Sequence, residues 1–343
     1  MKTLTLIKPD DWHIHIRNGA VLKTVLPHTA KQFARAIIMP NLKPPVTTVA
    51  QALAYRDEIL QALPLRSSFT PLMTLYLTAQ TAVSEIKKAA DSEYIHAFKM
   101  YPAGATTNSD AGVADISGIY PLLAALEKND LPLLIHGEVT DPNCDIFDRE
   151  RQFVDSTLTK ITNNFPNLRI VLEHVTTTEA VDFVINAGSN MAATITPQHL
   201  LYNRNALLAG GLRPHYYCLP ILKRESHRQS LIKAATSGNP KFFLGTDSAP
   251  HLTHTKENAC GCAGCYSAHA AIELYAEAFE HAEALDKLEG FASFYGADFY
   301  RLPRNTDTIS LTKTSWRVPL YYGDEANNIT PLKAGEEINW KIL

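Results

Sequence analysis

Short apolar runs alternate with amphipathic segments along the whole chain, and this alternation restricts the fold more than any other feature of the sequence. The runs are rich in β-branched and aromatic residues and lie at 12–16, 35–41, 69–77, 96–101, 131–137, 169–175, 191–197 and 241–247. Helical periodicity is clearest over 48–63, 79–90 and 115–129, and Thr177 or Thr178 is expected to cap a further helix that runs to Gly188. Runs that are apolar on both faces are typical of parallel strands covered by helices.

Eight strand–helix units in one undivided chain favour an α/β fold of the (β/α)8 TIM-barrel type, and a doubly wound parallel sheet is the alternative. No linker, repeat or charge block divides the sequence, so residues 1–343 are expected to form a single barrel domain. The long stretch 198–240, between the last two strands, should carry an inserted loop. Residues 303–343 lie beyond the eighth unit, and their aromatic residues predict a packed C-terminal extension.

Composition narrows the class of protein. Lys and Arg number 32 against 35 acidic residues, and this near-neutral balance argues against nucleic-acid or membrane partners. No apolar run approaches the ~18 residues that span a bilayer, and the N-terminal run is too short for a signal peptide. A cytoplasmic protein is therefore expected, in which the five cysteines are free thiols. Cys260, Cys262 and Cys265 lack a fourth ligand at suitable spacing, which favours a Gly-rich loop over a structural metal site.

Metal-binding and proton-transfer side chains lie in or at the end of most of the apolar runs. The active site of a barrel lies at the carboxyl ends of its strands. These side chains are His13, His15, Asn41, Lys99, His136, His174 and Asp247. Taken singly, each has an ordinary structural explanation, such as a helix cap for Asp247 or a solvent-reaching side chain for Lys99. His13 and His15 alternate along one strand, so both imidazoles should point into the barrel, which is costly unless something binds them.

The number of ligands at these strand ends points to two metal ions. Four histidines and an aspartate exceed what one zinc ion needs when a water position stays open. Two ions about 3.5–4 Å apart, sharing a hydroxide, would use all of them. Nitrogen and oxygen donors suit zinc, and iron, manganese or cobalt are alternatives.

Longer motifs narrow the family. They are DWHIHIR (11–17), MPNLKPP (39–45), FKMYPAGATTNS (98–109), HGEV (136–139), EHVTT (173–177), ATITPQHL (193–200), RPHYYCLPILK (213–223) and GTDSAPH (245–251). In this order, from about residue 8 to about residue 300, they resemble the class II, single-function bacterial dihydroorotases of the amidohydrolase superfamily. The C-terminal 40 residues add little to the resemblance.

The resemblance implies a centre of two Zn²⁺ ions. His13 and His15 would bind the more buried ion together with Asp247, and His136 and His174 would bind the other. Lys99 would be carboxylated to N6-carboxylysine and would bridge both ions, as would a hydroxide. Desolvation of a buried lysine favours the neutral amine that forms such a carbamate, which explains a lysine inside an apolar strand.

The resemblance also implies a site for dihydroorotate. It assigns substrate binding to His15, Arg17, Asn41, Thr106, Thr107, His136, Leu219, His251 and Ala263. Arg17 follows His15 by two residues and is expected on the same strand face, where its guanidinium can bind a carboxylate through two hydrogen bonds. Residues 102–114 would form a mobile lid that places Thr106 and Thr107 on the substrate.

The implied activity is that of a zinc-dependent cyclic amidohydrolase. It would interconvert N-carbamoyl-L-aspartate and L-dihydroorotate in de novo pyrimidine biosynthesis, with Asp247 as the catalytic proton carrier. The alternatives are a related hydantoinase or allantoinase, and a non-enzymatic metal-binding protein on the same barrel. A homodimer is expected from the family, with the segment 266–289 as one candidate for its interface.

Overall fold

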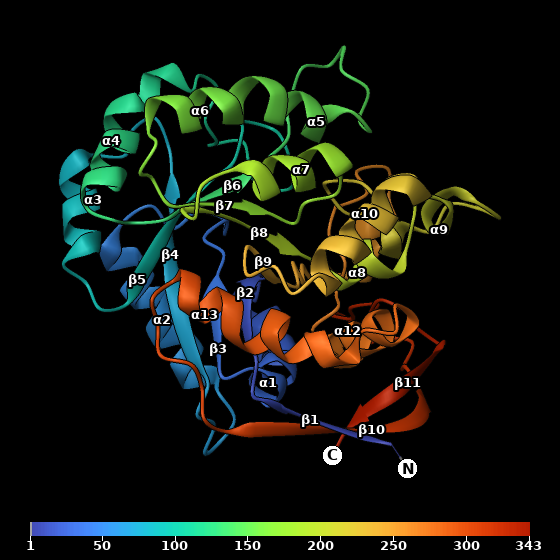
Figure 1. The fold of residues 1–343 in the computed structure, drawn as a ribbon. Coiled ribbons are helices and arrows are strands. Elements are labelled where there is room, and N and C mark those ends of the chain that lie inside the picture. The colour runs from blue at the N-terminus through green and yellow to red at the C-terminus, as the bar shows by residue number, and fades with distance from the viewer. Residues whose placement is uncertain (1) are drawn as a thin grey trace.

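The computed structural model describes residues 2–343, and eight parallel strands form its centre (Figure 1). They pair in chain order and are β2 (Asp10–Ile14), β3 (Arg35–Ile38), β4 (Thr70–Leu77), β5 (Ile95–Met100), β6 (Leu133–His136), β7 (Ile170–Glu173), β8 (Met191–Ile195) and β9 (Phe242–Leu244). Beyond the end of β9, the amide of Asp247 donates to the carbonyl of His13 at 2.8 Å and the amide of His15 donates to Ser248 at 3.0 Å. These bonds join the last strand to the first, so the (β/α)8 barrel is confirmed and the doubly wound sheet is excluded.

Helices surround the barrel as the periodicity predicted. They include α1 (Gly19–Gln32), α2 (Val49–Ala62), α3 (Val83–Ala90), α4 (Tyr120–Lys128), α5 (Arg149–Phe153), α6 (Thr159–Asn164), α7 (Thr178–Asn186), α10 (Glu225–Thr236) and α12 (Ala271–His281). The side chain of Thr48 caps α2 in a reciprocal arrangement with Gln51, and the side chain of Thr177 accepts the amide of Ala180 at the start of α7. These caps satisfy amides that the first turn of a helix leaves unpaired.

The segment between β8 and β9 is long because it holds further structure besides α10, the helix that covers this part of the barrel. It contains α8 (Pro197–Leu201), α9 (Asn205–Leu208) and an irregular stretch before α10. Figure 1 shows α9 and the chain after it standing out from the barrel. The irregular stretch returns to the barrel mouth, where Leu219 lines the central cavity. The predicted insertion therefore forms part of the site.

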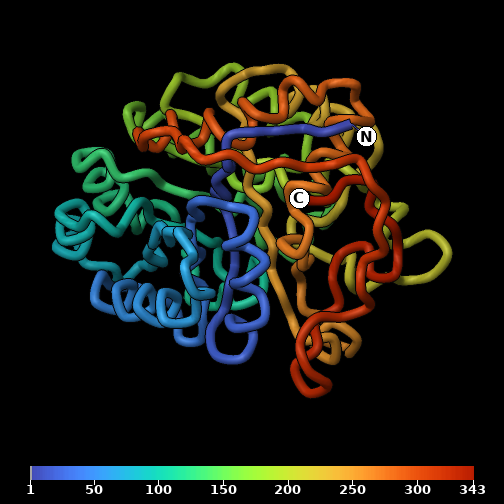
Figure 2. Tube along the Cα trace, turned by 90° about the horizontal axis from the view of Figure 1, so that it is seen from below, coloured from blue at the N-terminus to red at the C-terminus, as the bar shows by residue number. Residues whose placement is uncertain are grey.

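The C-terminal extension forms a second, smaller sheet. β10 (Thr308–Arg317) pairs antiparallel with both β1 (Thr3–Ile7) and β11 (Glu337–Ile342). Figure 2 shows the N-terminal strand beside the last part of the chain. Leu311 and Trp340 are fully buried in the same apolar cluster as the barrel helices. The sequence predicted packing here but missed β1, which is short and half exposed and therefore carries a weak pattern.

Apolar side chains fill the interior of the barrel below the site. Trp12, Ile37, Leu134, Val171 and Phe243 point inward and are at most 1 % exposed. The ring of Trp12 stacks on Tyr300, from the chain after α13 (Tyr295–Phe299), with ring centres 4.6 Å apart. This plug leaves room for a cavity only at the carboxyl ends of the strands.

Two further observations bear on partners. The residues from Ala271 to Phe279 of α12 are buried within the chain, so the exposed part of the candidate interface segment 266–289 is confined to the residues after Phe279. Within residues 2–343, no helix has the length and apolar character required to cross a bilayer.

Candidate metal centre and substrate pocket

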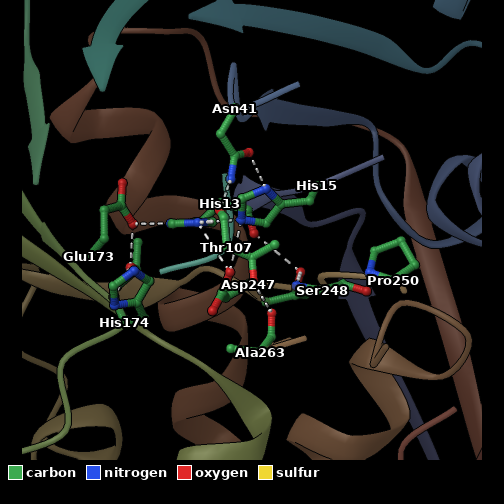
Figure 3. Close-up of polar contacts among 12 residues, drawn as sticks. His13, His15, Asn41, Thr107, Glu173, His174, Asp247, Ser248, Pro250 and Ala263 are labelled. Atoms are coloured by element: carbon green, nitrogen blue, oxygen red, sulfur yellow. Dashed lines mark hydrogen bonds and ion pairs between the residues drawn. The ribbon is translucent and has the colours of Figure 1, made fainter. Parts of the chain in front are cut away.

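Three ligand atoms converge where the ends of β2 and β9 meet (Figure 3). Asp247 Oδ1 lies 3.1 Å from His15 Nε2 and 3.3 Å from His13 Nε2, and the two Nε2 atoms are 3.4 Å apart. Among residues 2–343, this is the single group of three or more His, Cys, Asp or Glu residues whose ligand atoms all lie within 4.8 Å of one another. All three side chains are buried.

Hydrogen bonds on the far side of each imidazole fix which nitrogen faces this point. His13 Nδ1 donates to Glu173 Oε2 at 2.8 Å, and His15 Nδ1 donates to Asn41 Oδ1 at 2.8 Å. Both Nε2 atoms therefore present lone pairs toward each other and toward a carboxylate oxygen. Three acceptors at this separation repel one another unless a cation lies between them, and neutral imidazoles with an outer hydrogen bond are typical metal ligands.

The remaining predicted ligands line the other side of the same space. The ring centres of His13 and His174 are 5.0 Å apart, and those of His136 and His174 are 4.7 Å apart. His136 Nε2 donates to Glu138 Oε2 at 2.7 Å, which leaves its Nδ1 as the free ligand atom. His174 Nδ1 and Lys99 Nζ are buried and have no hydrogen-bond partner among the described residues. Buried polar atoms of this kind normally have a partner, so both atoms are free to meet a bound group.

Burial also favours the neutral forms of three predicted ligands, whereas the pKa of His13 is raised because burial is outweighed by the carboxylates of Glu173 and Asp247. Burial lowers the pKa of His15 to about 3 and holds the pKa of His174 well below its ordinary value. It lowers the pKa of the Lys99 ammonium to about 8. Neutral imidazoles are the form that binds metal, and a neutral amine is the form that can react with CO₂. The residues present therefore fit a two-metal centre with a modified lysine.

Two acidic residues outside the predicted set support the ligands. Besides accepting from His13, Glu173 Oε2 accepts the hydroxyl of Thr194 at 2.5 Å, and the same hydroxyl oxygen accepts the amide of His174 at 2.7 Å. Glu138 holds His136 in the same way that Glu173 holds His13. The sequence carried a signal for both, because each glutamate lies within two residues of a ligand histidine, in HGEV and EHVTT.

Left-handed backbone conformations aim three of the functional side chains. Arg17, His174 and Asp247 have φ values of 57°, 42° and 44°. Such values are unfavourable for residues other than glycine, and they concentrate at functional sites where the surrounding structure holds them. The strands β2, β7 and β9 end before these residues, so the turns after the strands direct the side chains into the barrel mouth.

Arg17 reaches the site by a different route from the one predicted. β2 ends at Ile14, so Arg17 lies in the following turn and does not share a strand face with His15. Its Nε donates to the carbonyl of Pro250 at 3.1 Å, and its Nη2 lies 3.1 Å from His251 Nε2. Burial, followed by the charge of Arg17, lowers the pKa of His251, so this imidazole is neutral. The positive charge of the pair therefore belongs to the guanidinium.

The segment after β5 covers the cavity. Thr107 contacts residues on two sides of the pocket. Its carbonyl accepts from Asn41 Nδ2 at 3.3 Å, and its hydroxyl donates to the carbonyl of Ala263 at 3.4 Å (Figure 3). The loop is held in shape by Ser109, whose hydroxyl donates to the carbonyl of Thr106 at 2.6 Å. In this arrangement, residues of the predicted lid form part of the cavity roof.

The central cavity brings together most of the predicted residues. Those that line it are His13, His15, Arg17, Asn41, Thr106, Thr107, His136, His174, Leu219, Asp247 and Ala263. Tyr101, which the sequence did not single out, also lines it, and its ring lies 5.0 Å from Lys99 Nζ. His251 lines the adjoining outer pocket, and Lys99 is fully buried within β5.

Comparison with known proteins agrees with this arrangement. The sequence model of the amidohydrolase family matches residues 1–320 of this chain. A dihydroorotase of Acaryochloris marina is 64% identical over 343 residues, which cover 100% of this chain and 99% of that protein. The solved dihydroorotase of Saccharomyces cerevisiae superposes with a TM-score of 0.91 at 35% identity, over 100% of this chain and 99% of that one. That of Campylobacter jejuni gives a TM-score of 0.91 at 34% identity, over 99% and 97% of the two chains. The chain therefore belongs to the amidohydrolase family and, within it, to the dihydroorotases.

Proposed function

We propose that this site interconverts N-carbamoyl-L-aspartate and L-dihydroorotate with the help of two zinc ions. One observation carries the proposal. The ligand atoms of His13, His15 and Asp247 converge in a cavity that the guanidinium of Arg17 also lines. A metal site alone would suit many hydrolases, but a fixed positive charge in the same cavity selects a substrate that carries an anion. The yeast relative is described in complex with 5-fluoroorotic acid, and the carboxylate of such a ring would match the guanidinium of Arg17 in the cavity here.

The ligands divide between the two ions by their positions around the cavity. His13, His15 and Asp247 hold one ion, and His136 and His174 hold the other. When bound, the ions supply Lewis acidity, because they polarise the scissile carbonyl and lower the pKa of the attacking water toward ~7. Zinc is the ion that best suits this set of imidazole and carboxylate ligands.

Lys99 bridges the two ions as N6-carboxylysine. Its nitrogen has no partner among residues 2–343, and burial lowers the pKa of its ammonium to about 8, which makes the reactive amine more accessible than in an exposed lysine. Carboxylation replaces a cation that would repel the metals with an anion that attracts them. The carbamate of Lys99 would supply oxygen ligands to the ions.

Substrate orientation comes from the walls of the cavity. Arg17, with Asn41 and His251 beside it, binds the carboxylate, while peptide groups of Leu219 and Ala263 contact the ring amide. Thr106 and Thr107, from the loop over the cavity, close on the substrate and exclude bulk water. His15 and His136 line the same cavity and would contact the ring at its reacting edge.

Asp247 moves the proton. Its Oδ1 faces His13 and His15, which leaves Oδ2 to exchange a proton with the reacting atoms. In ring opening, Asp247 takes a proton from the attacking water and delivers it to the ring nitrogen as the C–N bond breaks. Ring closure is the reverse, with the proton passing from the carbamoyl nitrogen to Asp247 and then to the departing oxygen.

Replacement of Arg17 by methionine tests the carboxylate pocket. Methionine keeps a similar length but removes both donors, and hydrogen bonds to charged groups contribute about 1.5–3 kcal/mol each. Loss of the pair should raise the KM for dihydroorotate by about 100-fold or more. Steady-state kinetics of the ring-opening reaction measure this change.

The control is Arg151→Met, since Arg151 lies on α5 with its side chain 58% exposed and outside the cavity. This control should leave KM unchanged. An Arg17→Met variant with wild-type KM would contradict the proposed pocket and would favour an enzyme for an uncharged ring, such as a hydantoinase or allantoinase.

We also infer the setting in which the enzyme works. Residues 1–343 act as one barrel domain, because the terminal sheet shares the main apolar cluster. We propose that the enzyme works in the cytoplasm, and its five free cysteines, which suit a reducing compartment, support this proposal. A homodimer would cover exposed apolar side chains such as Leu208 and Leu212, which are 51% and 74% exposed beside α9.

A further inference from the structure

Lys256 is a buried cation beside the substrate cavity that no step above uses. It ends the short helix α11 (Thr253–Lys256) and is 4% exposed. Its ammonium donates to three backbone carbonyls, those of Tyr217 at 3.2 Å, Cys262 at 2.8 Å and Gly264 at 2.6 Å. All three ammonium protons are therefore taken up by the backbone.

These carbonyls belong to two segments that are far apart in the sequence. The first leads to Leu219 and the second contains Ala263, and both residues line the cavity. The amide of Gly264 donates to the carbonyl of Tyr217 at 2.9 Å, so the two segments also touch directly. Lys256 thus bridges the two pieces of irregular backbone that form one wall of the pocket.

The second segment has little freedom to move toward the barrel. A Cβ added at Gly264 would lie 2.6 Å from the carbonyl oxygen of Ala249, and Gly264 has a φ of 149°. In the same segment, the carbonyl of Ala263 accepts the hydroxyl of Thr107, which comes from the loop over the cavity (Figure 3). Small shifts of this backbone would therefore change both the pocket wall and its roof.

Lys256 carries its charge in a buried position, which costs free energy of desolvation. Burial lowers the pKa of Lys256, and the charge of Arg17 lowers it further. Carbonyl dipoles compensate the charge in place of a carboxylate. An apolar residue could fill the same volume, so the charged form is expected to have a role in positioning the backbone.

We infer that Lys256 is a positioning residue that sets the ring-binding peptide groups of Leu219 and Ala263 in the geometry the substrate needs. This inference rests on the proposed function, because that function places the ring against these two peptides. The role belongs to substrate binding and not to proton transfer, since Lys256 contacts the backbone behind the wall and does not line the inner cavity.

Lys241 provides a matched control from the other end of the barrel. It precedes β9, and its ammonium donates to the carbonyls of Val184 at 3.1 Å, Ile185 at 3.0 Å and Ala187 at 2.5 Å, at the end of α7. The number and kind of contacts match those of Lys256. Because a strand of the barrel separates Lys241 from the cavity, its removal should destabilise the fold without altering the pocket.

The experiment compares Lys256→Met with Lys241→Met in the full chain. Steady-state kinetics give kcat and KM for dihydroorotate, and thermal unfolding gives Tm. Calorimetry gives the Kd of orotate, a ligand that has the ring and the carboxylate but is not hydrolysed. We expect Lys256→Met to raise KM and the orotate Kd by about tenfold while kcat falls by less than about threefold. Lys241→Met should lower Tm by a similar amount but leave KM and Kd within about twofold of wild type.

Lys256→Gln, which keeps a donor but not the charge, provides a second variant if Lys256→Met does not fold, and its KM should lie between those of the wild type and methionine. Wild-type KM and Kd in a folded Lys256 variant would overturn the inference, as would an equal rise in KM for Lys241→Met. Wild-type protein that converts neither substrate would instead contradict the proposed function.

Discussion

Replacing Asp247 by asparagine should reduce kcat/KM for both directions by about 10²–10⁴-fold, the range typical of a lost general acid–base group. Asparagine keeps an oxygen that can face His13 and His15, which lie 3.3 and 3.1 Å from Asp247 Oδ1. It cannot accept a proton from water or return one to the ring nitrogen. The loss should therefore fall on turnover, while metal binding survives to a large extent.

Metal content measured by atomic emission separates these two effects. Asp247→Ala should be as inactive as Asp247→Asn, and Asp286→Asn, which changes a carboxylate 70% exposed on the surface, should behave as wild type. Substantial activity in both Asp247 variants would show that another group carries the proton.

Lys99→Ala is expected to lose metal and activity together. The ammonium nitrogen of Lys99 lies within a fully buried strand position and has no hydrogen-bond partner among residues 2–343. Removal of one member of a buried charged set costs about 3–5 kcal/mol, which corresponds to about 150- to 4,000-fold in metal affinity. Zinc titration against a chelator of known affinity measures the change.

Small carboxylates such as acetate or propionate should restore part of the activity of Lys99→Ala, because they can enter the vacated space and bridge the two ions. Lys223→Ala removes another buried lysine, whose ammonium donates to the carbonyl of Ile221 at 3.0 Å, and should keep its metal. Wild-type metal content in Lys99→Ala would rule out the bridging role.

Local periodicity was sufficient to predict the barrel and the level of its active site. All eight expected strands form, with boundaries within a few residues, because apolar runs between helices leave few other arrangements. Alternation along the first apolar run correctly placed His13 and His15 together, although β2 ends at Ile14, and both side chains reach Asp247 beyond β9. These features depend on neighbours in the sequence or on the common direction of the strands.

Features that depend on tertiary contacts were not predictable in the same way. The surrounding loop imposes a positive φ on Arg17, which turns the chain after β2. Strand alternation therefore predicted the position of Arg17 in the site but not the backbone conformation that places it there. The partners of Glu173 and Glu138 depend on which imidazole nitrogen faces the cavity. β1 gains its stability from β10, about 300 residues later, and its own sequence gives little sign of that pairing.

The most direct test of the central claim is metal analysis of the purified chain beside an assay of both reaction directions. We expect two zinc ions per chain, conversion of N-carbamoyl-L-aspartate to dihydroorotate and the reverse, and loss of both activities when a chelator removes the metal, with recovery when zinc is added. Metal-replete protein that converts neither compound, or full activity after complete metal removal, would contradict the claim that this barrel is a metal-dependent dihydroorotase.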